Sequence, residues 1–220
     1  MITLYHCLSA RSFRALWTLE EIGLACELKM LPFPPRALKP EYLEVNPLGT
    51  IPLLIDGESR LTESAAICQY LAVRHSPRAL NVEPDEPGFA DYLNFLHFGE
   101  ATLTFPQTLV LRYSRLEPKE RRQPQVAEDY AKWFLARLRT LEPRLQPGGF
   151  LAAGRFTAAD VSVGYALMLA GILGMSPRFT PAVAAYWTRL RERPAYQRAL
   201  QLQEQAAREQ GVVPNPDVGP

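Results

Sequence analysis

The chain has 220 residues, which is enough for one large domain or two small ones with a hydrophobic core that needs no metal or disulfide. Lysine and arginine total 24 against 23 acidic residues, so the net charge of +1 gives no basis for binding nucleic acid or an anionic membrane. The three cysteines match neither a zinc site nor a disulfide framework, and no apolar run approaches the roughly 20 residues that span a bilayer. We expect a cytoplasmic protein without a metal site, a signal peptide or a membrane span.

The first predicted elements form a strand–helix–strand unit. Residues 2–6 are rich in β-forming side chains and predict a strand. Over residues 13–23 apolar side chains recur three residues apart, with acidic residues on the other side, which predicts a helix that ends at Gly23. The apolar stretch 26–31 predicts a second strand.

A proline-rich loop and a tight turn follow this unit. Prolines at 32, 34 and 35 disfavour regular structure, and residues 41–45 predict a short helix. The Asn46-Pro47-Leu48-Gly49 sequence then predicts a turn, and Ile51-Pro52 leads into the next apolar stretch.

A hairpin and a helix complete the first half. The strands predicted over 53–55 and 60–62 flank an Asp56-Gly57 pair, which is a strong hairpin signal. Glu63-Ser64 then opens an apolar helix over 64–74, so the elements close a small mixed sheet covered by helices. The tight turn, the X-Pro bond and the acid–hydroxyl pair at a helix start together describe a backbone-lined pocket for an anionic, peptide-like ligand.

The second half shows helical periodicity alone and predicts an all-α domain. A helix predicted over 158–173 is apolar on nearly all sides, which is typical of a helix at the centre of a domain. Thr157 and Asp160 have the spacing of a capping box for this helix, and we expect a structural role for both. The predicted division is 1–76 for the sheet domain, 77–87 for an acidic, proline-rich linker, 88–206 for the all-helical domain and 207–220 for an irregular tail.

These features occur together and in this order in one family. The sheet-containing first half, the Asn-Pro-x-Gly-x-x-Pro turn, the Glu63-Ser64 pair, the helical second half and the Thr-x-x-Asp box resemble the cytosolic glutathione S-transferase superfamily over essentially the whole chain. The resemblance implies a thioredoxin-like N-terminal domain of order β-α-β-α-β-β-α, followed by an all-α domain. The segment 9–17 also resembles a bacterial and fungal subgroup with a Ser-Arg-Ser loop before the first helix, although here Ala10 separates Ser9 from Arg11.

The resemblance implies a set of glutathione-binding residues. Pro52 would follow a cis bond, and Ile51 would offer its N–H and C=O to the cysteinyl backbone of glutathione, as an added strand does. Ser64 would bind the γ-glutamyl carboxylate at a helix N-terminus, and Glu63 would face the ammonium group. Lys39, or Arg36, is the candidate for the glycine carboxylate, although the histidine–lysine pattern of the family is absent.

The loop after the first strand holds the candidate catalytic residues. Catalysis in the family requires the glutathione thiol to ionise near neutral pH, and one hydroxyl hydrogen bond to sulfur is sufficient to lower its pKa. Ser9 is the first candidate for this thiolate-stabilising donor, with Arg11 and Ser12 as alternatives. A further alternative is Cys7, which would instead form a mixed disulfide with glutathione.

The resemblance also implies a function and an assembly. We expect a glutathione transferase that attacks hydrophobic electrophiles or reduces organic hydroperoxides, with glutathione as co-substrate and no prosthetic group. The alternatives are a disulfide reductase or thiol transferase and a non-catalytic binding relative. A homodimer would form through residues 65–71 and 92–98. The candidates for the wall of the electrophile site are Leu8, Phe105, Leu109 and Tyr113.

Overall fold

The computed structural model describes residues 1–76, 79–145 and 148–214. The chain divides into two compact units, one of residues 1–76 together with the C-terminal segment from Glu192 onward, and the other ending at Arg191. The predicted helical domain over 88–206 is therefore corrected at its C-terminal end, because its last helix packs within the first unit. Residues 77–78 of the predicted linker and 215–220 of the predicted tail lie outside the described residues.

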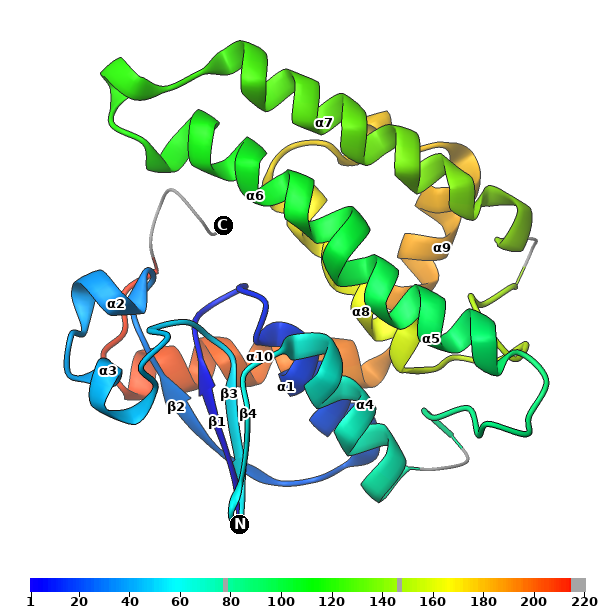
Figure 1. The fold of residues 1–220 in the computed structure, drawn as a ribbon, viewed down its shortest axis with the longest axis horizontal. Helices are drawn as coiled ribbons and strands as arrows, with labels where there is room; N and C mark the ends of the chain where they lie inside the picture. Colours follow the sequence, from blue (N-terminus) through cyan, green and yellow to red (C-terminus); the bar gives the residue numbers. More distant parts are fainter. Residues whose placement is uncertain (77–78, 146–147, 215–220) are drawn as a thin grey trace. The chain divides into compact units, whose positions relative to one another are not determined.

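A four-stranded mixed sheet lies at the centre of the first unit (Figure 1). The strands β1 (Ile2–His6), β2 (Cys26–Met30), β3 (Leu53–Asp56) and β4 (Ser59–Leu61) take the order β2-β1-β3-β4. β1 runs parallel to β2, whereas β3 is antiparallel to both β1 and β4. The predicted mixed sheet and its hairpin are thus confirmed, and β2 and β4 are its edges.

Five helices accompany this sheet: α1 (Phe13–Ile22), α2 (Pro35–Leu38), α3 (Tyr42–Val45), α4 (Ser64–His75) and α10 (Pro194–Glu209). The short helix α2 was not expected among the prolines. It forms because Pro35 occupies the first helical turn, where a missing N–H costs no hydrogen bond. The helix α10 extends three residues into the segment predicted to be an irregular tail.

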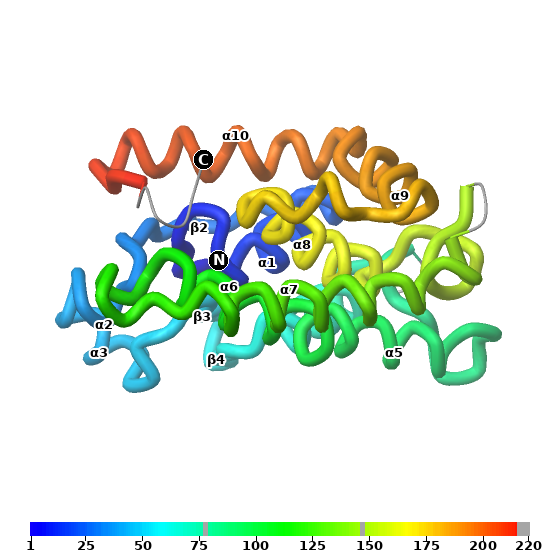
Figure 2. The backbone as a smooth tube through the Cα atoms, turned by 90° about the horizontal axis from the view of Figure 1, so that it is seen from above, coloured from blue at the N-terminus to red at the C-terminus, as the bar shows by residue number. Residues whose placement is uncertain are grey.

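The helix α10 packs on α1 and β2, as the ribbon in Figure 1 and the backbone tube in Figure 2 show. The ring of Tyr196 lies edge-on to Phe13 at 5.5 Å and to Trp17 at 4.9 Å between centroids. Arg193 forms two hydrogen bonds to the carboxylate of Glu21, at 2.6 and 2.7 Å. Aromatic packing and a bidentate ion pair thus hold the C-terminal helix to the N-terminal one.

Among the described residues of the second unit, helices joined by loops make up the regular structure, as predicted. Its longer helices are α5 (Phe89–His97), α6 (Phe105–Leu111), α7 (Pro124–Leu138), α8 (Ala158–Ile172) and α9 (Pro181–Arg191). Two π-helical segments, Phe98–Thr104 and Arg112–Leu116, continue α5 and α6, and short 3₁₀ turns cover Lys119–Arg121, Arg139–Arg144 and Ser176–Arg178.

The helix α8 is buried along most of its length and begins at a capping box. The carboxylate of Asp160 accepts hydrogen bonds from the N–H and the hydroxyl of Thr157, at 2.9 and 3.2 Å. It also accepts bonds from the Leu151 N–H at 3.2 Å and the Tyr186 hydroxyl at 2.7 Å. Because the group is fully buried, the pKa of Asp160 is raised to about 6. The cap therefore joins α8 both to the loop before it and to α9.

Candidate functional site

The turn before β3 is held by side-chain hydrogen bonds to its backbone. The Asn46 side chain donates to the Thr50 carbonyl at 2.9 Å and accepts from the Leu48 N–H at 3.2 Å. The hydroxyl of Tyr42 donates to the same Thr50 carbonyl at 2.9 Å. Gly49 has a φ of +61°, and a side chain there would also lie 2.8 Å from two side-chain carbons. Both the backbone conformation and the lack of space therefore require glycine at this position.

The backbone of Ile51 lies just before the start of β3. The pairing of β3 with β1 ends at Leu53 opposite Tyr5, and its pairing with β4 begins only at Leu54. Ile51 is therefore beyond the last paired residue on both sides of the strand. The Ile51–Pro52 bond is cis, and Pro52 itself is buried.

Ser64 is the first residue of α4 and is only 3% exposed. Its hydroxyl accepts a hydrogen bond at 3.3 Å from Arg14, a fully buried arginine of α1. A helix N-terminus and a buried guanidinium both favour negative charge, so this corner of the first unit suits a carboxylate. Glu63, in the N-cap position, is exposed and forms no capping bond with its side chain.

The two candidate cations for a second carboxylate lie on the surface. Lys39 is 47% exposed and forms an ion pair with Glu41 at 3.6 Å. Arg36 donates to the Leu48 carbonyl at 3.1 Å and so supports the 46–49 turn. An exposed ion pair contributes little, and Lys39 can exchange Glu41 for a bound carboxylate at small cost.

Ser9 lies in the loop between β1 and α1 in a left-handed conformation, with a φ of +54°. This conformation costs a non-glycine residue about 1 to 3 kcal/mol, so the surrounding contacts must hold it. The Ser9 N–H donates to the side-chain oxygen of Gln203 on α10 at 3.0 Å, and the Gln203 amide donates to Ser9 Oγ at 3.4 Å. The Gln203 oxygen also contacts His6 Nε2 at 3.0 Å. Burial lowers the pKa of His6 to about 4, so its ring is neutral at neutral pH.

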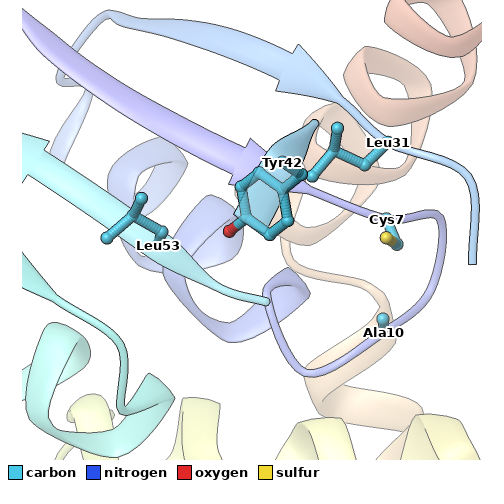
Figure 3. Packing of buried hydrophobic residues seen from close by; sticks show 5 residues of the cluster. All are labelled: Cys7, Ala10, Leu31, Tyr42 and Leu53. Carbon is cyan, nitrogen blue, oxygen red and sulfur yellow. The ribbon is translucent and has the colours of Figure 1, made fainter. Parts of the chain in front are cut away.

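The rival residues of this loop have different surroundings. Ser12 is fully buried, and its hydroxyl accepts from the Cys7 N–H at 3.3 Å and contacts the Cys7 carbonyl at 3.5 Å. Cys7 packs in an apolar cluster with Ala10 and Leu31 (Figure 3), and burial raises the pKa of its thiol to about 12. Its weak S–H contact is to the Pro32 carbonyl at 3.6 Å. The Ser12 hydroxyl thus stabilises the loop by bonding to the Cys7 backbone. Cys7 is a small apolar core residue rather than a thiolate.

The candidates for the electrophile wall belong to different units. Leu8 and Ser9 line a hollow of about 300 Å³ in the first unit, together with Gln203 and Ala207 of α10 and with Val212. In the second unit, Phe105 is 56% exposed at the start of α6, and Leu109 and Tyr113 are half-buried. The guanidinium of Arg112 lies 5.7 Å from the centre of the Tyr113 ring.

Among the described residues, none of the helices combines the length and the apolar character needed to cross a bilayer. Within the same residues, histidine, cysteine and acidic side chains nowhere gather in a group of three that suits a metal ion.

Comparison with known proteins gives the family. The family model described as "Glutathione S-transferase, N-terminal domain" matches residues 1–73. Glutathione S-transferase 3 of Zea mays is 30% identical to the chain over an alignment of 202 residues that covers 88% of this chain and 90% of the maize protein. The chain belongs to the glutathione S-transferase family. Similarly, glutathione S-transferase A of Pleuronectes platessa is 29% identical over 199 residues, 89% of this chain and 88% of that protein.

A solved structure supports the same assignment. The glutathione transferase URE2P6 from Phanerochaete chrysosporium, solved in complex with oxidized glutathione, matches with a TM-score of 0.80 and 29% sequence identity. The match covers 93% of this chain and 97% of that one. Together the comparisons identify a glutathione S-transferase enzyme with a thioredoxin-like N-terminal domain and a helical C-terminal domain.

Two buried polar residues of the site were not anticipated from the sequence. Arg14 lies on the buried side of α1 next to Ser64, and Gln203 lies on the buried side of α10 next to Ser9. In α10 the buried Ala199 lies four residues before Gln203 and the buried Ala206 three residues after it, and the buried Tyr196 lies one further helical turn before Ala199. A glutamine at a core position of an amphipathic helix is the sequence signal that reveals it.

Proposed function

We propose that the first unit binds glutathione beside the N-terminal end of β3 and the N-terminal end of α4. The observation that carries this proposal is the buried contact between Arg14 and Ser64, which adds positive charge to a helix N-terminus. The γ-glutamyl carboxylate binds at Ser64, and Glu63 faces the ammonium group. Ile51, followed by Pro52, presents its N–H and C=O to the cysteinyl backbone of the ligand.

Lys39 is the proposed partner of the glycine carboxylate. The proposed site then offers a partner to each carboxylate of glutathione. The N-terminus of α4 at Ser64 serves the γ-glutamyl carboxylate, and Lys39 serves the glycine carboxylate. Glutathione is the co-substrate, and the proposed reaction involves no prosthetic group. The family membership and the complex of the similar fungal enzyme with oxidized glutathione support this ligand.

Ser9 is the proposed donor to the thiolate sulfur. Lowering the pKa of the thiol by two units from about 8.5 requires about 2.7 kcal/mol. One hydrogen bond to a charged group supplies about 1.5 to 3 kcal/mol, so a single well-placed hydroxyl is sufficient. The left-handed backbone of Ser9, held by Gln203, supports a functional role, since backbone strain of this kind gathers at active sites.

The structure weakens the alternatives for the catalytic residue. Ser12 uses its hydroxyl on the Cys7 backbone, and the Cys7 thiol has a pKa near 12, which leaves almost no thiolate at neutral pH. Arg11 is half-buried and stays the second candidate. Because Cys7 would be the nucleophile of a thiol transferase, its burial favours conjugation or hydroperoxide reduction over disulfide exchange.

The proposed second substrate is a small hydrophobic electrophile or an organic hydroperoxide. Leu8 provides apolar surface next to Ser9, and Phe105, Leu109 and Tyr113 of the second unit are further candidates from the sequence. Each square ångström of apolar surface buried by such a substrate contributes about 25 cal/mol. The intact Ser64 corner argues against the remaining alternative, a non-catalytic relative whose site has decayed.

Assembly and location complete the proposal. A homodimer is proposed through α4 and α5, where the outer side of α4 carries a shallow hollow of about 310 Å³ lined by Ala66, Tyr70 and Val73. The proposed location is the cytoplasm. The similarity to a fungal transferase supports the proposed relation to the bacterial and fungal subgroup.

Calorimetric titration with glutathione tests the binding site. We expect wild-type protein to bind, and Ser64→Ala to weaken binding about tenfold or more through the loss of a charge-assisted hydrogen bond. Ser114→Ala, the same change at a serine of the second unit whose hydroxyl bonds the Val110 carbonyl, is the matched control and should bind like wild type. Absence of binding by wild-type protein would refute the proposed function as a whole.

Conjugation of 1-chloro-2,4-dinitrobenzene tests the catalytic assignment. Ser9→Ala should lower kcat/KM by about tenfold to a hundredfold near neutral pH, because less of the bound glutathione is ionised. Cys7→Ser should retain most of the activity. The opposite pattern, with Cys7 essential and Ser9 dispensable, would favour the thiol-transfer alternative.

A further inference from the structure

We infer that Gln203 is a positioning residue for Ser9, so that a side chain of the last helix sets the direction of the hydroxyl proposed to ionise glutathione. This inference rests on the proposed role of Ser9. It starts from three contacts of one buried amide, which is 2% exposed: with the Ser9 N–H, with Ser9 Oγ and with the His6 ring.

The hydrogen-bond chemistry fixes the orientation of the Gln203 amide. The Ser9 N–H can only donate, so the side-chain oxygen of Gln203 must face it, at 3.0 Å. The amide nitrogen then faces Ser9 Oγ at 3.4 Å and donates to it. Since the same oxygen lies 3.0 Å from His6 Nε2, that ring nitrogen must carry a hydrogen. Each of the three contacts is therefore satisfied by one arrangement of donors and acceptors.

This arrangement determines what the Ser9 hydroxyl can do. A hydroxyl has one hydrogen to donate and two lone pairs to accept. The bond from Gln203 uses a lone pair of Oγ and not its hydrogen. It thereby favours rotamers in which the hydroxyl hydrogen points away from Gln203, and it polarises the O–H as a donor. Both effects suit donation to a thiolate.

His6 contacts the same Gln203 oxygen as the Ser9 N–H does. Burial lowers the pKa of His6 to about 4, so the ring stays neutral and supplies a single N–H to the Gln203 oxygen near neutral pH. The side chain of Gln203 is thus fixed between β1 and the loop that follows it. Ser9 and Gln203 also line the same hollow of about 300 Å³, so the pair reaches a surface where a ligand can be accommodated.

Two substitutions at this position separate positioning from folding. Gln203→Met has a similar length and removes all three hydrogen bonds. Gln203→Glu keeps an acceptor for the Ser9 N–H and for His6 but has no N–H to donate, so the Ser9 hydroxyl would turn its hydrogen to the carboxylate instead of to sulfur. The matched control is Gln205→Met on the exposed face of the same helix, where Gln205 bonds only to Glu209 at 2.7 Å in the described structure.

The measurement is the pKa of the thiol of bound glutathione, followed by the ultraviolet absorbance of the thiolate as a function of pH. Thermal unfolding of each variant is recorded beside it. We expect Gln203→Met to raise this pKa by about one unit, which lowers the thiolate population about tenfold well below the pKa. Gln203→Glu should raise it at least as far, and Gln205→Met should leave it unchanged.

A cycle with Ser9→Ala decides whether the effect passes through Ser9. In the Ser9→Ala background, Gln203→Met should raise the pKa of the thiol no further. An equal rise in both backgrounds, or an unchanged pKa in a folded Gln203→Met protein, would overturn the inference. If Gln203→Met does not fold, an unchanged pKa in Gln203→Glu overturns it equally. A wild-type pKa in Ser9→Ala alone would instead refute the proposed role of Ser9, and the inference with it.

Discussion

Lowering the pH from 7 to 5 should remove about 2 kcal/mol of the free energy of unfolding through His6 alone. The ring is fully buried against Gln203, and its pKa falls from 6.5 to about 4, mainly because burial disfavours the charged form. Between these two values the unfolded chain binds a proton that the folded protein excludes. The stability due to His6 is therefore complete above pH 6.5 and is lost as the pH falls toward 4.

The magnitude follows from the distance between the assay pH and the unfolded value. A pH of 5 lies 1.5 units below the pKa of 6.5 of the imidazole in the unfolded chain. At about 1.36 kcal/mol per unit, protonation stabilises the unfolded chain by about 2 kcal/mol. Asp160 acts in the opposite direction, because burial raises its pKa from 3.8 to about 6 and the folded protein binds the proton more tightly. Its protonation raises the free energy of unfolding by about 1 kcal/mol between pH 7 and pH 5.

Urea unfolding at pH 7, 6 and 5 of wild-type protein and of His6→Gln measures the difference. Glutamine can still donate to Gln203 but does not titrate. On acidification the variant should therefore keep the stabilisation due to protonation of Asp160 and lose the destabilisation due to His6. Its free energy of unfolding at pH 5, relative to pH 7, should exceed that of wild type by about 2 kcal/mol. Parallel pH profiles of the two proteins would refute the reasoning.

The capping box and one helix contact yield two further predictions for the second unit. Asp160→Ala should lower the free energy of unfolding by about 3 kcal/mol or more, since it leaves the buried Tyr186 hydroxyl and two backbone N–H groups without their acceptor. Gly99→Ala should cost about 1 to 3 kcal/mol, because its Cβ would lie 2.4 Å from Ser162 Oγ and 2.5 Å from the Ser162 carbonyl carbon. Chemical denaturation checks both, with Gly171→Ala as control, and an unchanged midpoint in either variant would contradict its prediction.

The local parts of the fold and of the site could be predicted because their signals lie within a few residues. The 46–49 turn depends on Asn46, whose side chain bonds the backbone of Leu48 and Thr50, and on Gly49, which has a positive φ. Ser64 could be placed at a helix start because the apolar run after it is continuous. Each of these assignments depends on spacing, which a single sequence displays directly.

The non-local parts could not be predicted in the same way. The amphipathic pattern of α10 shows that one face is buried but does not say against which element, and the helix was therefore grouped with the wrong half of the chain. Ser9 and Gln203 are 194 residues apart, so no local pattern connects them. Which of Ser9, Arg11 and Ser12 can donate to the glutathione sulfur also depends on the geometry of the loop. This geometry directs the Ser12 hydroxyl to the Cys7 backbone.

The return of α10 to the first unit has a consequence for biosynthesis. Phe13 and Trp17 are synthesised long before their partner Tyr196. Glu21 likewise waits for Arg193, 172 residues later. The second unit contains only consecutive residues and can complete its packing first, while the packing of the first unit is finished only once α10 has been made.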